Sequence, residues 1–199
     1  MPPHFTIVLA KDLETVDGRA PSSRTQTHNR ILCKSCSAIL GTFDESASGF
    51  RILKSSVAVQ STKGSTAESF SKDVFLAAQL LSLIDHASTR RVAVYDERPI
   101  DTDKETVLLL WIFSTDLRYS SSTVKRNPKR AMKVLFRKSV NLGEQPGMSF
   151  NTSEDLHLPS DLKDHLEHSL ETSSSMLPVS SRYFQEWTVG LLERFQPED

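Results

Sequence analysis

The spacing of apolar residues along the chain separates segments that favour helices from segments that favour strands. Apolar side chains recur every three or four residues over 71–86, which predicts a helix with Ser71 available to cap its first turn. Its inward face would carry Val74, Phe75, Ala78, Leu81 and either Leu80 or Ile84. A second helix is expected over about 159–170, with Ser160 as its cap and the serines at 173–175 as its stop.

A third helix is predicted near the end of the sequence, over about 180–195. One broad face of it would bury Tyr183, Phe184, Trp187, Leu191 and Phe195. Strands are predicted where apolar and β-branched residues run together or alternate. Those segments are 31–32 and 38–41 on either side of a pair of cysteines, then 50–54, 57–59, 91–96, 106–113 and 131–138. The nearly all-apolar 106–113 should be a central strand buried on both faces, whereas the alternating 131–138 should be half-buried.

These elements predict an α+β fold, in which a mixed or antiparallel sheet of several strands is covered by about three helices and a Cys-x-x-Cys knuckle lies near the start. The ordered domain should cover 31–196. Residues 1–30 should form a poorly ordered arm or a remnant strand, because 5–10 is strand-like while 17–30 is polar and has almost no apolar period. A loop is expected over 143–150.

Bulk composition narrows the class of protein. Of the 199 residues, 38% are hydrophobic and 25% are charged, which is typical of a globular chain and not of a disordered or membrane-spanning one. No apolar run approaches the roughly 18–20 residues that a spanning helix requires, and the start of the sequence lacks the basic and apolar segments of a secretory signal. Two cysteines so close together cannot form a disulfide framework, so we expect a reducing compartment, cytoplasmic or nuclear.

Charge is distributed unevenly, although the formal net charge is only -1. Eight Lys or Arg and no acidic residue occur over 118–138, whereas six acidic residues and a single Lys occur over 154–171. Such blocks either steer a charged partner or neutralise each other within the fold. The basic stretch 125–130, with Tyr119 and Phe136 nearby, could contact phosphates and stack a base. Without a recognisable nucleic-acid-binding fold, direct nucleic-acid binding is not expected.

Cys33 and Cys36, the only thiols of the sequence, are spaced as half of a structural zinc site. The histidines that could complete it are His28, His4, His86, His157, His165 and His168. The helical i, i+3 spacing of the last two could hold a metal by itself, but their acidic neighbours favour a solvated, charged face. A redox dithiol and a pair of ordinary buried cysteines remain alternatives for the thiols. Neither a serine-hydrolase elbow nor a phosphate-binding glycine loop occurs.

Four segments taken together resemble one family. They are ILCKSC at 31–36 with 39–41, VLLLWIFSTDLRY at 107–119, AMKVLF at 131–136, and 177–178 with FQEWTVGLL at 184–192. Their order and spacing are similar to the C-terminal half of the HECT-like ubiquitin-conjugating-enzyme-binding proteins. The fungal members look closest, and the animal members are described as ubiquitin-protein ligases.

The resemblance implies a protein that binds a ubiquitin-conjugating enzyme and acts as, or with, an E3 ubiquitin ligase to promote protein ubiquitination. Cyclin-type or other proteins would be its substrates, and no membrane partner is expected. The alternative role that the resemblance implies is a non-catalytic binding or chaperone module for the endonuclease of the pre-mRNA cleavage and polyadenylation machinery. The lack of a third cysteine in this sequence favours binding over chemistry, because the HECT reaction passes through a cysteine thioester.

The family pattern includes an earlier Cys-x-x-Cys pair in an N-terminal half, and the pair in this sequence corresponds to the later one. With no earlier pair, the zinc site would hold two ligands of four, and a truncated gene product or mispredicted gene start would explain the first 30 residues. The expected partner contacts lie at a strand end and in the basic loop after it: Asp116, Arg118, Tyr119, Lys125 and Arg126. Arg118 could instead pair locally with Asp116 or with an acidic helix.

Overall fold

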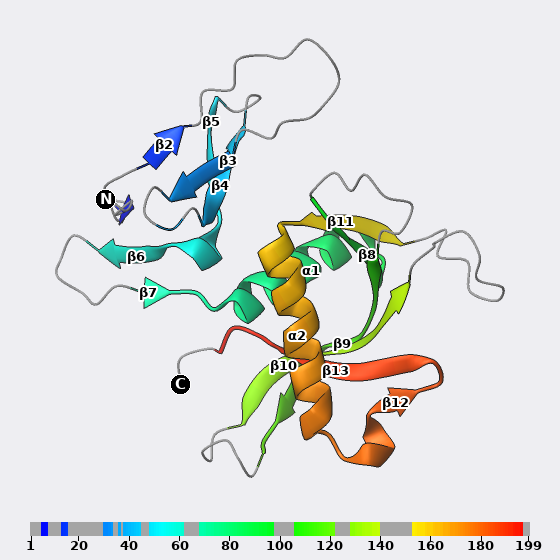
Figure 1. Ribbon diagram of the computed structural model, residues 1–199. Helices are drawn as coiled ribbons and strands as arrows, with labels where there is room; N and C mark the ends of the chain where they lie inside the picture. The colour runs from blue at the N-terminus through cyan, green and yellow to red at the C-terminus, as the bar shows by residue number, and fades with distance from the viewer. Residues whose placement is uncertain are drawn as a thin grey trace. The chain divides into compact units, whose positions relative to one another are not determined.

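The computed structural model describes residues 5–7, 13–15, 30–33, 36, 38–44, 48–61, 68–97, 106–121, 128–139 and 153–196. The chain forms two compact units, Met1–Ser71 and Lys72–Asp199, and each has sheet structure of its own (Figure 1). The loop expected over 143–150 and nearly all of the polar segment 17–30 lie outside the described residues.

The first unit contains two small antiparallel sheets. Four strands pair in the order β2 (Leu13–Thr15), β3 (Arg30–Cys33), β4 (Ile39–Asp44) and β5 (Gly49–Ile52). The other sheet has the order β1 (Phe5–Ile7), β6 (Ala58–Ser61) and β7 (Glu68–Ser69), with a single 3₁₀ turn, η1 (Lys54–Ser56), between β5 and β6. The strands predicted around the cysteine pair are confirmed as β3 and β4, and the apolar residues Ile31 and Leu40 from them are buried.

The second unit is built on a six-stranded mixed sheet. Its order is β11 (Glu154–Leu158), β8 (Arg91–Asp96), β9 (Val107–Tyr119), β10 (Lys129–Ser139), β13 (Trp187–Glu193) and β12 (Tyr183–Phe184). Only the edge pair β11–β8 is parallel. β9 lies inside the sheet, and its residues from Val107 to Leu110 are almost fully buried, which confirms the predicted central strand. The short strand β11 has no counterpart among the predicted elements.

Two helices of the second unit pack against each other and against β13 (Figure 1). α1 (Lys72–Ala87) confirms the first predicted helix, and α2 (Ser160–Met176) confirms the second but continues past its predicted end. On α2 the buried leucines Leu162, Leu166 and Leu170 recur every four residues. Within the described residues, neither helix combines the length and apolar content needed to cross a bilayer.

The buried face of α1 differs from the predicted one. Leu76, Ala77 and Leu80 are buried, whereas Ala78, which was expected on the inward face, is exposed. Apolar residues occupy positions all around this helix, so their spacing alone does not define one stripe. The contacts that α1 makes with α2 and β13 select the buried stripe.

The third predicted helix is wrong, because 180–195 forms a 3₁₀ turn, η2 (Val179–Ser181), followed by the β12–β13 hairpin. Phe184 pairs with Trp187 across a turn in which Gln185 has a positive φ of 54°. A spacing of four residues keeps side chains on one face of a helix, and because four is even it also keeps them on one face of a strand. Trp187 is buried, whereas Tyr183 and Phe195 are exposed.

The serines that were expected to end α2 lie inside it instead. Ser173 and Ser174 are buried in the last turns of the helix. The Ser173 hydroxyl donates to the Leu170 carbonyl at 2.9 Å and accepts the Leu191 N–H of β13 at 2.8 Å. A buried serine is stable in a helix when both hydrogen-bonding roles of its hydroxyl are satisfied. The predicted cap is also wrong, because Pro159 holds the N-cap position and Ser160 is the first residue of the helix, where its hydroxyl donates to Asp96 at 2.8 Å.

Replacing Ser173 by Ala is therefore expected to lower the free energy of unfolding by about 1–3 kcal/mol, because the Leu191 N–H loses its partner in a part-buried position. Chemical denaturation of the variant measures this loss. The matched control is Ser175→Ala on the same helix, where the hydroxyl is exposed and bonds only to the Thr172 carbonyl. Equal stability of the two variants would contradict the bridging role of Ser173.

Candidate interaction site at the end of the central strand

The far end of β9 is irregular where it pairs with β10. Ile112 pairs with Val134 and Leu117 pairs with Ala131. An advance of five residues along β9 is therefore matched by an advance of only three residues along β10. Extra residues of this kind form bulges, which bend a strand and re-aim its side chains. Asp116 lies in this irregular stretch, directly before the resumed pairing at Leu117.

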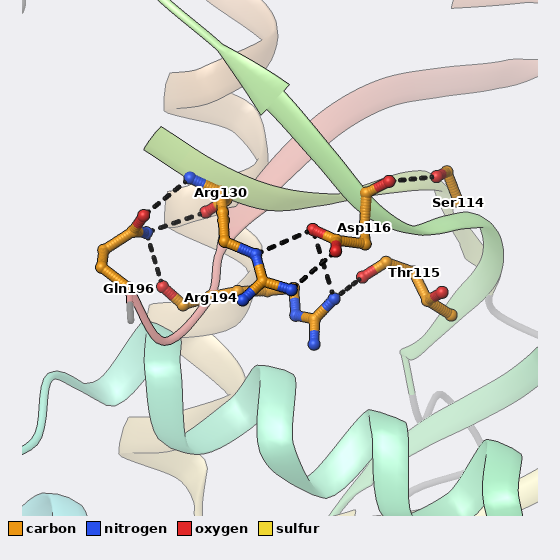
Figure 2. Close-up of polar contacts among 6 residues, drawn as sticks. All are labelled: Ser114, Thr115, Asp116, Arg130, Arg194 and Gln196. Atoms are coloured by element: carbon orange, nitrogen blue, oxygen red, sulfur yellow. Dashed lines mark hydrogen bonds and ion pairs between the residues drawn. The ribbon is translucent and has the colours of Figure 1, made fainter. Parts of the chain in front are cut away.

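Asp116 is held by two arginines, Arg130 on the neighbouring strand β10 and Arg194 directly after β13 (Figure 2). Its carboxylate accepts hydrogen bonds from Nε of Arg130 at 3.1 Å and from Nη2 at 2.6 Å. This bidentate geometry makes arginine–carboxylate ion pairs strong. Nη1 of Arg194 lies 3.5 Å from the same carboxylate and donates to the Thr115 carbonyl. Hydrogen bonding from Arg130 is the main reason that the pKa of Asp116 is lowered.

The side chain of Gln196 extends the sheet past the end of β13 (Figure 2). Its amide oxygen accepts the backbone N–H of Arg130 at 2.8 Å, and its amide nitrogen donates to the carbonyls of Arg130 at 3.1 Å and Arg194 at 2.7 Å. Lys129 and Glu193 add an ion pair at 2.9 Å between the same two strands. The ends of β9, β10 and β13 are thus joined by side chains into one rigid corner.

The structure describes three of the five predicted contact residues, and they lie at this corner. Asp116 is engaged by the arginines described above, while Arg118 is exposed and lies opposite Arg130 in the strand register. Tyr119 is half-buried opposite Lys129, and burial raises the pKa of its phenol. Lys125 and Arg126 lie outside the described residues.

The sequence left open a local ion pair between Asp116 and Arg118, but the ion-pair partners of Asp116 in the structure lie farther along the chain. They are Arg130 and Arg194, and the charge of Arg118 is the smallest of the three arginine contributions to the lowered pKa of Asp116. Arg194 and Gln196 were not among the predicted site residues. No local sequence pattern predicts their role, because they contact residues that are distant in sequence and that come close only where β13 ends beside β10.

The basic segment 118–138 and the acidic segment 154–171 form ion pairs with each other within the fold. Lys138, at the end of β10, contacts Glu167 and lies 3.4 Å from Glu171, both on α2. Hydrogen bonding to Glu167 is the main cause of the raised pKa of Lys138. These contacts match the alternative in which the basic and acidic blocks neutralise each other.

Comparison with known proteins identifies the family. The model of the family described as "HECT-like Ubiquitin-conjugating enzyme (E2)-binding" matches residues 4–189. The chain belongs to this family. The resemblance seen in the four sequence segments is thereby confirmed, and the match includes both compact units.

Two curated relatives of this HECT-like E2-binding chain are fungal. An uncharacterized protein of Schizosaccharomyces pombe is 26% identical over 181 residues, which cover 85% of this chain and 49% of the relative. An uncharacterized protein of Saccharomyces cerevisiae is 26% identical over 166 residues, which cover 83% of this chain and 44% of the relative. The chain thus spans about half the length of these relatives. No solved structure matches it.

The cysteine pair of this HECT-like chain lies in the turn between β3 and β4. The backbone N–H of Cys33 donates to the Ala38 carbonyl at 2.9 Å and closes the turn, which confirms the predicted knuckle. Cys33 is half-buried and Cys36 is exposed. No group of three potential metal ligands occurs within the part of the chain that the structure describes. Zinc prefers four ligands, of which Cys33 and Cys36 would be two. The zinc site stays a prediction.

The histidines considered for that site have other surroundings where the structure describes them. His165 lies 2.8 Å from Asp73 between α2 and α1, and His157 stacks on Tyr95 with ring centroids 5.2 Å apart. His168 is exposed on α2. His86 contacts the Ser82 carbonyl one turn earlier on α1. His4 and His28 lie outside the described residues.

Replacing Asp116 by Asn is expected to lower the melting temperature at neutral pH and to have a vanishing effect in acid. The folded-state pKa of Asp116 lies below its ordinary value of 3.8, so the unfolded chain takes up a proton first as the pH falls. The stabilisation by the ionised carboxylate is therefore present above about pH 4 and is lost as the pH falls through the lower folded-state pKa. Melting curves of both proteins between pH 7 and pH 2 measure this difference.

The control for this titration is Asp155→Asn, because Asp155 is exposed on the edge strand β11. That variant should melt like the parent protein at every pH. An Asp116→Asn variant whose deficit stays constant down to the acid limit would contradict the ion pairs with Arg130 and Arg194.

Proposed function

We propose that this chain binds a ubiquitin-conjugating enzyme and promotes the ubiquitination of other proteins by that enzyme. The observation that carries the proposal is the family match over residues 4–189, because the family is described by its binding to this class of enzyme. The curated relatives are uncharacterized, so they add support for the family and not for an activity.

We further propose that the enzyme contacts the exposed residues at the end of β9. Arg118 is exposed beside a corner that the Asp116–Arg130 pair and Gln196 hold together. Because the backbone there is already fixed by these contacts, little conformational entropy would be lost when a partner binds. The proposed contact set keeps the residues expected from the sequence, namely Arg118, Tyr119, Lys125 and Arg126. Asp116 would act as a positioning residue.

The chemistry that we propose leaves the ubiquitin thioester on the conjugating enzyme. The sequence has two thiols, both in the turn between β3 and β4, and the backbone hydrogen bond from Cys33 to Ala38 holds that turn closed. In the transfer, the neutral amine of a substrate lysine attacks the thioester carbonyl, a C–N bond forms, and the C–S bond to the conjugating enzyme breaks. The conjugating enzyme's cysteine leaves as a thiol, taking up the proton that the amine loses. A bound protein accelerates such a step by orienting the reactants, without a nucleophile of its own.

Discharge of a ubiquitin-loaded conjugating enzyme onto free lysine tests this mechanism. The parent chain and the Cys33→Ser/Cys36→Ser double variant should accelerate discharge equally, and neither should carry a thioester-linked ubiquitin on a non-reducing gel. A ubiquitin adduct that forms on the parent chain and disappears in the double variant would overturn the proposed mechanism in favour of a cysteine intermediate.

Arg118→Glu is expected to weaken the stimulation of discharge about tenfold or more, because it reverses an exposed charge at the proposed contact. The fold should be unaffected, which the melting temperature checks. The matched control is Arg51→Glu, an exposed arginine of the first unit that is not in the proposed contact set. Equal stimulation by Arg118→Glu and by the parent chain would exclude this end of β9 as the contact.

A further inference from the structure

The sheet of the second unit has a face that points away from α2. Gly190 of β13 faces α2, because a Cβ atom there would lie 2.9 Å from the Leu170 carbonyl oxygen. Its neighbour Val189 therefore points to the opposite face. The strand register runs from Val189 to Leu135, Trp111 and Arg91, so these four residues form one row across β13, β10, β9 and β8.

Aromatic rings gather around this row. Trp111 lies edge-on to Phe113, Phe184 and Trp187, with each pair of ring centroids 6.3 Å apart. Trp187 is buried in a cluster with Leu109 and Leu135 beneath the surface, whereas Phe113 and Phe184 are 51% and 45% exposed. Exposed aromatic rings on a packed apolar base are typical of protein interaction sites.

Cations border the same rings. The Arg91 guanidinium lies 5.8 Å from the Trp111 centroid, Nζ of Lys133 lies 5.0 Å from that of Phe113, and the Arg137 guanidinium lies 4.6 Å from that of Trp187. Arg137 also forms an ion pair with Glu186, whose carboxylate oxygen lies 3.4 Å from its Nη1. We call the rings and the three cations together the aromatic–cation face.

We propose that the aromatic–cation face binds an acidic protein segment that places an aromatic or aliphatic side chain against Phe113 and Phe184. The apolar side chain would cover the two exposed rings, and a flanking carboxylate would meet Lys133 beside Phe113. A basic segment would face like charges, so charge selects the acidic one. The rings cross at 66–74°, so they are not parallel platforms on which successive bases would stack, and a peptide suits them better than a nucleic acid.

This surface shares no residue with the proposed contact set at the end of β9, and its test contains no ubiquitin component, so the two proposals can fail separately. Both tryptophans of the sequence, Trp111 and Trp187, lie in the aromatic–cation face, and intrinsic tryptophan fluorescence therefore reports on it directly. The probe is a synthetic peptide with a central phenylalanine and leucine flanked by glutamates, without tryptophan. Its control replaces every glutamate by lysine.

The acidic peptide should change the fluorescence saturably, and the lysine peptide should bind at least about tenfold more weakly. Phe113→Ala and Phe184→Ala should each weaken binding of the acidic peptide about tenfold with little change in the melting temperature, because about half of each side chain is exposed. The matched control is Phe195→Ala, since Phe195 is 60% exposed and is not one of the rings of this face. That variant should bind like the parent chain.

Three results would overturn the proposal. One is the absence of a saturable change with the acidic peptide, and another is binding that Phe113→Ala and Phe184→Ala both leave intact. The third is tighter binding of a single-stranded RNA oligomer than of the peptide, lost in the same two variants, because it would assign the aromatic–cation face to nucleic acid.

Discussion

The Trp187→Ala variant is expected to lose about 3–5 kcal/mol of unfolding free energy, the cost of removing a large aromatic side chain from a packed core. Trp187 is 1% exposed, packs with Leu109 and Leu135, and lies under the Arg137 guanidinium. Urea denaturation followed by circular dichroism measures the loss without relying on tryptophan emission. The effect should appear as a lower midpoint with little change in the slope of the transition.

The same experiment distinguishes the β12–β13 hairpin from the helix that the spacing of aromatics favours. Tyr183→Ala should change stability by no more than about 0.5 kcal/mol, because Tyr183 is 67% exposed on the short edge strand. A helix with one buried aromatic face would make the two substitutions comparably costly. Similar losses for Trp187→Ala and Tyr183→Ala would therefore contradict the hairpin.

The Gly190→Val variant is expected to lose about 3 kcal/mol or to fail to accumulate as a folded protein. A Cβ atom at position 190 would lie 2.9 Å from the Leu170 carbonyl oxygen and 3.0 Å from Cδ2 of Leu170. Backbone atoms of α2 cannot turn aside as a side chain can, so the helix must move away from the sheet and give up contacts along its buried leucines. Denaturant titration and the yield of soluble protein report the loss.

Thr188→Val is the matched control for this substitution. Thr188 is half-buried on the same strand, and valine is well suited to strands, so we expect a change below about 1 kcal/mol. If Gly190→Val unfolds at the same denaturant concentration as the parent chain, then α2 does not pack closely on β13 at this point.

The elements that the sequence predicted well are those with one dominant pattern. The apolar run after Thr106 can be satisfied only by burial on both faces, and it forms the interior strand β9. The alternation over 131–138 identifies β10, but the strand is not half-buried as expected, because Leu135 on its second face is buried as well as Val134 and Phe136. Helix α2 was predicted from its opening at 159–161, but its end was missed because the Ser173 hydroxyl is satisfied inside the helix by the Leu170 carbonyl and by the Leu191 N–H of β13.

The predictions failed where one spacing fits two structures or where partners are distant in sequence. The residues 183, 187, 191 and 195 have a spacing that a helix and a strand share, and only the turn at Gln185 decides between them. The Asp116 corner needs two bulges and Arg194, which lies 79 residues beyond Thr115, so no local pattern could reveal it. The family resemblance, by contrast, could be seen in the sequence alone, because it depends on the order of linear motifs.

Binding to ubiquitin-conjugating enzymes tests the central claim most directly. The complete chain is titrated by calorimetry with each member of a panel of purified conjugating enzymes, and Arg118→Glu is titrated alongside it. We predict saturable binding to at least one enzyme, weakened at least about tenfold in Arg118→Glu. Folded protein that binds no enzyme of the panel would contradict the proposed function.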